Sequence, residues 1–160
     1  MNGPQYALHR VHGAEQDLVV LLDEITTRHA QDHEVLHVAR DLRGWSAEHI
    51  AVLTDHAADR GIRLDDDTSG PGGARRLVAA AGHLLRRPDP GILLLEDMHD
   101  LYLAASHASL AWEMLAQIAQ AQHDRDLLGL TGRCHPQTLR QIRWANTMLK
   151  TLSPQILSAL

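Results

Sequence analysis

The sequence predicts an all-α protein built as a four-helix bundle. Aromatic residues are scarce, with three Trp, two Tyr and no Phe, so the core must consist of Leu, Ala, Ile, Val and Met. Such a core is more typical of packed helices than of sheets. Apolar residues also recur at helical spacing over long segments bounded by glycine or proline. The length of 160 residues indicates one domain over residues 1–160.

The longest predicted helix covers residues 90–122, and Asp89-Pro90 supplies its start signal. Both of its sides are apolar, which is typical of a helix that is buried on both sides. One stripe at helical spacing contains Ile92, Glu96, His99, Leu103, His107, Leu110, Met114, Gln117 and Ala121. The opposite stripe contains Leu94, Leu101, Ala105, Ala108, Trp112, Leu115 and Ala119. We expect the first stripe to face the core and the second to meet the preceding segment or another copy of the chain.

The N-terminal half predicts a helical hairpin. The pattern indicates a helix over residues 13–43 that ends at Gly44. Ser46 is expected to cap a shorter helix over residues 46–60, which Gly61 stops.

The C-terminal half predicts a second hairpin, reached through a long crossover. A polar loop leads into a short amphipathic helix over residues 74–87, which we expect to cover the bundle. After the long helix and a break near Gly129, a last helix is expected over residues 136–152, stopped by Pro154. Two hairpins joined by a crossover are one standard way to close a four-helix bundle.

Composition and charge exclude several classes of protein. The net charge of −5 is spread over interspersed acids and bases, so no basic field for nucleic acid is expected. No apolar run reaches membrane-spanning length, and Cys134 as the single cysteine allows no intrachain disulfide. We therefore expect a cytoplasmic protein with neither a nucleic-acid nor a membrane partner. Neither a serine-histidine-aspartate ordering nor a phosphate-binding loop is recognised, so the sequence does not support a hydrolase or a nucleotide enzyme. No complete catalytic constellation is found, and whether the protein is an enzyme stays undecided.

A faint internal repeat accompanies this order of helices. Arg28-His29-Ala30 recurs as Ser106-His107-Ala108, and each copy lies within a long predicted helix. The arrangement resembles the ferritin-like superfamily, which implies a bundle with inward metal ligands, one carboxylate from each long helix and Glu-x-x-His from its partner. His29 and His107 stand roughly where the single glutamates would be, and Glu96-x-x-His99 matches the motif on a different helix. The resemblance thus implies the fold, while the ligand set does not support di-iron oxidase chemistry.

Twelve histidines make a metal site the first candidate for function. Spacings of three and four residues allow ligands on one helix to converge on one ion, and nitrogen with carboxylate ligands suits Fe, Zn, Ni or Cu. The candidate ligands are His29, Asp32, His33, Glu96, His99 and His107. Alternatively no metal is bound, and these side chains satisfy one another in a core layer that fixes the register of the helices.

Two functions therefore remain open. The first is a ferritin-like bundle that binds a transition metal through inward histidines and carboxylates. The second is a metal-free ferritin-like bundle that acts as an oligomeric assembly or protein-interaction module. In either case we expect a homo-oligomer formed through the stripe that contains Trp112 and Leu115, because a monomer seldom exposes so large an apolar surface.

Overall fold

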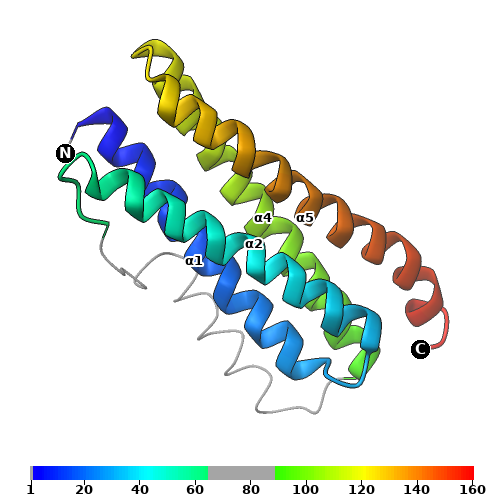
Figure 1. Cartoon of the computed structure of the whole chain (residues 1–160). Helices are drawn as coiled ribbons and strands as arrows, with labels where there is room; N and C mark the ends of the chain where they lie inside the picture. The colour runs from blue at the N-terminus through cyan, green and yellow to red at the C-terminus, as the bar shows by residue number, and fades with distance from the viewer. Residues whose placement is uncertain (1, 65–88) are drawn as a thin grey trace.

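The computed structural model describes residues 2–64 and 89–160, and within them the chain is helical with no strand. The helices are α1 (Gly3–Arg28), α2 (His33–Ala58), α4 (Pro90–Ala121) and α5 (Arg125–Leu157). α1 and α2 form one antiparallel hairpin and α4 and α5 form another, with α1 packed against α4 (Figure 1). α2 finishes at the end of the bundle where α1 begins, whereas α4 begins at the opposite end (Figure 1). The prediction of an all-α four-helix bundle is confirmed, while the expected helix over residues 74–87 lies outside the described residues.

The long central helix forms where the sequence predicts it. The carboxylate of Asp89 accepts hydrogen bonds from the backbone N–H of Gly91 at 2.8 Å and of Ile92 at 3.2 Å. Pro90 occupies the first helical position, where its missing N–H costs nothing. These contacts satisfy backbone groups that the first turn of a helix otherwise leaves unpaired.

Both predicted boundaries of the first helix, residues 13 and 43, are wrong. α1 already begins at Gly3 and ends at Arg28, and the chain turns before α2 begins at His33. The turn forms because Asp32 acts as an N-cap, its carboxylate accepting a hydrogen bond from the backbone N–H of Val35 at 3.1 Å. The apolar period runs on across this turn, so periodicity alone did not reveal it.

Gly44 does not end a helix, and the predicted helix over residues 46–60 starts too late. Gly44 lies in the middle of α2, and the only described glycine with a positive φ is Gly61, at 68°. A glycine ends a helix when it adopts the left-handed conformation, which Gly61 does and Gly44 does not. Gly61 follows the end of α2 at Ala58, so this stop signal was read correctly.

The last helix is nearly twice as long as the predicted 136–152. α5 begins at Arg125, because Asp124 caps it by accepting a hydrogen bond from Leu127 N–H at 2.9 Å. Pro136 lies inside this helix, where a proline normally costs about 3 kcal/mol. Buried side chains on both sides of Pro136 hold the helix in the bundle, and this packing overrides the proline signal.

The helical phase assigned to α4 is inverted. Trp112 and Leu115 are fully buried, whereas His107 and Leu110 lie on the exposed side. Small side chains such as Ala105 let neighbouring helices approach closely, so the stripe with less bulk faces the core. The stripe with larger side chains faces outward.

The core consists of two apolar clusters with a polar layer between them. One cluster joins the second half of α1 to the first halves of α2 and α4 and the C-terminal part of α5. The other joins the start of α1 to the end of α2, the second half of α4 and the first turns of α5. Within the described ranges, no helix combines the length and apolar character that crossing a membrane requires.

Candidate functional site

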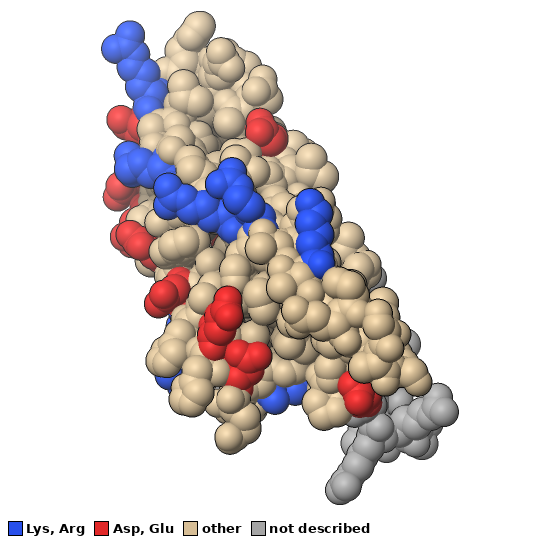
Figure 2. All heavy atoms as spheres, turned by 90° about the vertical axis from the view of Figure 1, so that its right-hand side faces the viewer, with Lys and Arg blue, Asp and Glu red and all other residues tan. Residues whose placement is uncertain are grey.

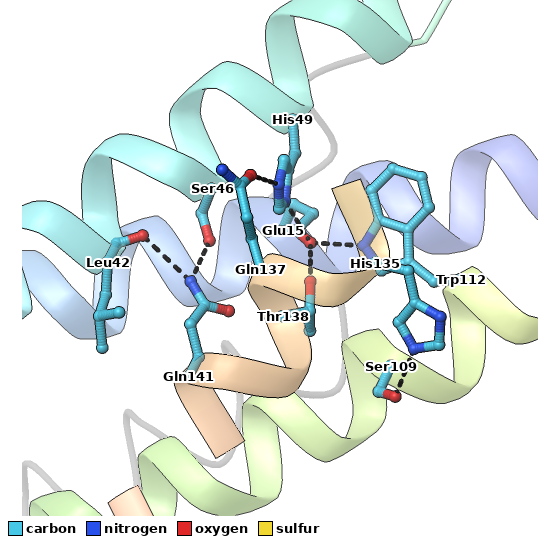
Figure 3. A network of polar contacts seen from close by, with 10 residues as sticks. All are labelled: Glu15, Leu42, Ser46, His49, Ser109, Trp112, His135, Gln137, Thr138 and Gln141. Carbon is cyan, nitrogen blue, oxygen red and sulfur yellow. Dashed lines mark hydrogen bonds and ion pairs between the residues drawn. The ribbon is translucent and has the colours of Figure 1, made fainter. Parts of the chain in front are cut away.

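The polar layer is centred on the carboxylate of Glu15 on α1, which has no exposed side-chain surface (0%). Its Oε1 accepts hydrogen bonds from His49 Nδ1 at 3.0 Å, from Trp112 Nε1 at 2.7 Å and from Thr138 Oγ1 at 3.2 Å. Figure 3 shows these side chains converging from α1, α2, α4 and α5. All four described helices therefore contribute to one buried centre.

His49 contacts two oxygen atoms through its two ring nitrogens. Its Nδ1 contacts the Glu15 carboxylate, and its Nε2 contacts Gln137 Oε1 at 2.7 Å. Both of these atoms are acceptors, so the contacts favour the protonated ring, which alone carries two N–H groups. The rings of His49 and Trp112 also pack edge to face, with centroids 5.5 Å apart and an interplanar angle of 83°.

The pKa of His49 is raised above its usual 6.5. Burial on its own would lower this pKa, because a charged ring loses solvation. The hydrogen bond and the charge of Glu15 outweigh burial, and Gln137 adds to their effect. The centre is thus a buried ion pair whose charged state is stabilised by its partners.

A second hydrogen-bonded group continues the layer along α5. Gln141 Nε2 donates to Leu42 O at 3.0 Å and to Ser46 Oγ at 2.9 Å, which ties α5 to α2 (Figure 3). Among the described residues, Glu15 Oε2 and Gln141 Oε1 are buried without a hydrogen-bond partner. A buried polar atom without a hydrogen-bond partner costs stability, so the layer is not optimised for stability alone.

A serine, a histidine and a glutamate also meet at the seam between α4 and α5. His135 Nε2 lies 2.8 Å from Ser109 Oγ, and His135 Nδ1 lies 3.7 Å from Glu113 Oε1. A serine, a histidine and a carboxylate are the residue types of a catalytic triad for acyl transfer. That reaction also requires hydrogen-bond donors that stabilise an oxyanion. The backbone N–H groups in the middle of both helices are already used in the helices. The contact joins α4 to α5 through side chains.

The expected ligand His29 has a different buried partner. His29 is the C-cap of α1, and its Nε2 lies 2.6 Å from Asp97 Oδ2. Arg28 donates to the other oxygen of Asp97, so one buried carboxylate on α4 binds both residues at the end of α1. This contact fixes α1 against α4 near one end of the bundle.

The other candidate ligands do not gather around His29. Asp32 caps α2, and Glu96, His99 and His107 lie on the exposed side of α4 instead of facing inward as expected. His107 accepts a hydrogen bond from Arg10 at 2.9 Å. Across residues 2–64 and 89–160, no three His, Cys, Asp or Glu side chains come together as metal ligands would.

Sequence reasoning missed Glu15, His49 and Trp112 as a site, although spacing signals were present. Glu15 lies four residues after Val11 and three before Leu18, within the buried stripe of α1. His49 is likewise three residues after Ser46 and four before Leu53 on α2. A charged residue within an apolar stripe marks a buried polar group. The predicted helices began at residues 13 and 46, so Glu15 and His49 each stood in a first turn and were not recognised as part of a stripe.

Searches against protein-family models, curated proteins and solved structures found no match to this chain.

Proposed function

We propose that this chain is a ferritin-like bundle with a metal-free centre that acts as a homo-oligomeric assembly module. Two features support the likeness to ferritin-like bundles. Helices that follow one another in each hairpin are antiparallel, and α2 finishes at one end of the bundle whereas α4 starts at the other. The observation that carries the proposal is the Glu15–His49 ion pair at the centre of the bundle.

The chemistry of this centre does not fit a transition metal. A metal ion binds an imidazole through a nitrogen lone pair, and both nitrogens of His49 already contact acceptor oxygens, those of Glu15 and Gln137. The Glu15 Oε1 atom already accepts three hydrogen bonds, and the other side chains of the layer are an indole, two hydroxyls and two amides, which are poor ligands for Fe, Zn, Ni or Cu. The layer instead supports the interpretation in which buried polar groups fix the register of the helices.

The outward face of α4 and α5 supports an assembly role. Leu103, Leu110 and Met114 follow one another at spacings of seven and four on α4, and Leu110 is 66% exposed. Leu128 and Leu139 are exposed on α5. Because α4 and α5 pack side by side, these side chains form what we call the α4–α5 face.

The charges of these two helices favour a second copy as the partner. Residues 90–121 contain four acids and no Lys or Arg, whereas α5 has Arg133, Arg140, Arg143 and Lys150 and no acid after Asp126. Figure 2, which views the side along which α5 runs, shows Lys and Arg gathered over part of the surface and most acids toward one edge. In a two-fold pair, α4 of each copy meets α5 of its partner, so opposite charges face each other.

Sedimentation velocity at micromolar concentrations tests the assembly. We expect the wild type to sediment as a dimer or larger, and Leu110→Glu to sediment as a monomer. Val20→Glu is the control, because Val20 is also an exposed apolar residue, at 42%, but lies on α1. Added salt should weaken the assembly, since exposed opposite charges are screened. A monomeric wild type, or dissociation by Val20→Glu alone, would remove the α4–α5 face from consideration.

Metal binding in the interior stays a prediction with its own measurement. Elemental analysis of untagged protein, purified and then dialysed against a chelator, reports any ion that the bundle holds tightly. A stoichiometric metal that disappears in His49→Leu would contradict the metal-free centre. The single cysteine, a buried thiol, fits a reducing compartment, and on this ground we propose a cytoplasmic location.

A further inference from the structure

Two exposed histidines lie one above the other at the start of α2. His33 is the first residue of the helix and His37 follows four residues later, on the same side. Their rings are 6.3 Å apart between centroids and nearly parallel, with an interplanar angle of 21°. Within the described helices, no other two histidines on one helix are four residues apart. His29 has the same spacing from His33 but lies before the turn and contacts Asp97.

We propose that His33 and His37 form a chelating site for a divalent transition-metal ion on the surface of α2. Imidazole nitrogens bind Zn²⁺, Ni²⁺ and Cu²⁺ at about 2 Å. Residues four apart on a helix have Cβ atoms about 6 Å apart, a distance that two imidazoles can span through one ion. Both side chains are exposed, so small changes in their torsion angles disturb no packing.

The charges around the pair partly offset the unfavourable position of a cation at a helix N-terminus. The positive end of the helix dipole lies at His33 and disfavours a cation there. Asp32 and Glu34 are adjacent to His33 in sequence, and Asp41 lies one turn beyond His37 on the same side. The pair supplies two protein ligands and leaves the other coordination positions to solvent, so the bound ion exchanges readily. This site is separate from the polar layer and does not depend on the proposed assembly.

Calorimetric titration with Ni²⁺ and Cu²⁺ tests the site in untagged protein that has been treated with a chelator and dialysed. We expect one preferred ion per chain, with Cu²⁺ bound more tightly than Ni²⁺. His33→Asn and His37→Asn should each lower the affinity at least about tenfold, because the second imidazole no longer binds intramolecularly. Removing both histidines should cost little more than removing one.

The matched control keeps the number of histidines on this side of α2 and changes only their spacing. In His37→Asn/Arg40→His the two imidazoles are seven residues apart, a rise of about 10 Å that one ion cannot bridge. This variant should bind as weakly as His37→Asn, and His99→Asn on α4 should bind as the wild type does. The ion should also raise the thermal midpoint of the wild type but not of either asparagine variant. Unchanged affinity in His33→Asn and His37→Asn, or tight binding at the longer spacing, would overturn the proposal.

Discussion

The Glu15–His49 pair gives a quantitative test of the polar layer through replacement of Glu15 by leucine. The substitution removes the acceptor of three hydrogen bonds from a fully buried position. Thr138 can redirect its hydroxyl to a carbonyl of its own helix, whereas the indole N–H of Trp112 is stranded at a cost of about 1–3 kcal/mol. The loss of the counter-charge of His49 adds to this. We expect a total loss of about 3–5 kcal/mol in the free energy of unfolding, as for other broken buried pairs.

The double variant Glu15→Leu/His49→Leu separates the pair from its surroundings. His49→Leu alone should also cost about 3–5 kcal/mol, because it leaves the Glu15 carboxylate buried without its cation. Additive effects would then reach about 6–10 kcal/mol, enough to unfold many domains. Because the second substitution removes the group that the first one strands, we expect the double variant to cost no more than either single one.

Urea denaturation followed by circular dichroism measures these free energies. Asp23→Ala is the control, since it breaks an exposed ion pair with Arg43 and should cost less than about 1 kcal/mol. Single variants that lose less than about 1 kcal/mol, or effects that add within about 0.5 kcal/mol, would refute the account of the layer given above.

Three further predictions concern other features of the bundle. The folded pKa of His49 lies above its unfolded value of 6.5, so its protonation stabilises the fold below pH 6.5 and this stability is lost as pH rises through the folded pKa. Denaturation on both sides of pH 6.5 should show this loss in the wild type and not in His49→Leu. Gly44→Ala should stabilise by about 0.5–1 kcal/mol, because Gly44 is helical and a Cβ there has open space. Gly61→Ala should destabilise, because φ is 68° there, and equal signs for the two glycines would contradict the helix boundaries. Burial, followed by the charge of Glu15, raises the pKa of Cys134 to about 11, so a thiol reagent should react slowly with the folded protein and quickly in urea. Equal rates in both conditions would show that this thiol is accessible.

The helical class and the four long helices of the described residues could be predicted from the sequence, and the boundaries of these helices only in part. Asp89 and Gly61 were read correctly because each signal stands alone at the end of an apolar pattern. The turn before His33 was missed because the apolar spacing happens to continue across it. Pro136 was wrongly taken as the start of the last helix, because packing along the whole length of α5 outweighs the local cost of a proline inside a helix.

The orientation of α4 and the central layer could not be predicted from one helix at a time. Both sides of α4 are apolar, and only the close approach of its neighbours decides that Ala105 and Ala108 face inward. The oligomer prediction named Trp112 and Leu115, which are core residues, for the same reason. The partners of Glu15 lie on three other helices, so recognising the layer requires the relative register of all four.

The spread of the Glu15 contacts along the chain bears on the order of folding. Glu15 lies 34 residues from His49, 97 from Trp112 and 123 from Thr138. The contact with His49 lies within the α1–α2 hairpin, whereas the contacts with Trp112 and Thr138 close much longer loops. Each hairpin should therefore form before the whole layer does. The layer then acts as a late check, because a pair of hairpins docked one turn out of register would bury these groups without partners. Conservative substitutions at Thr138 should therefore give φ-values near zero, and values near one would place the layer in the folding nucleus.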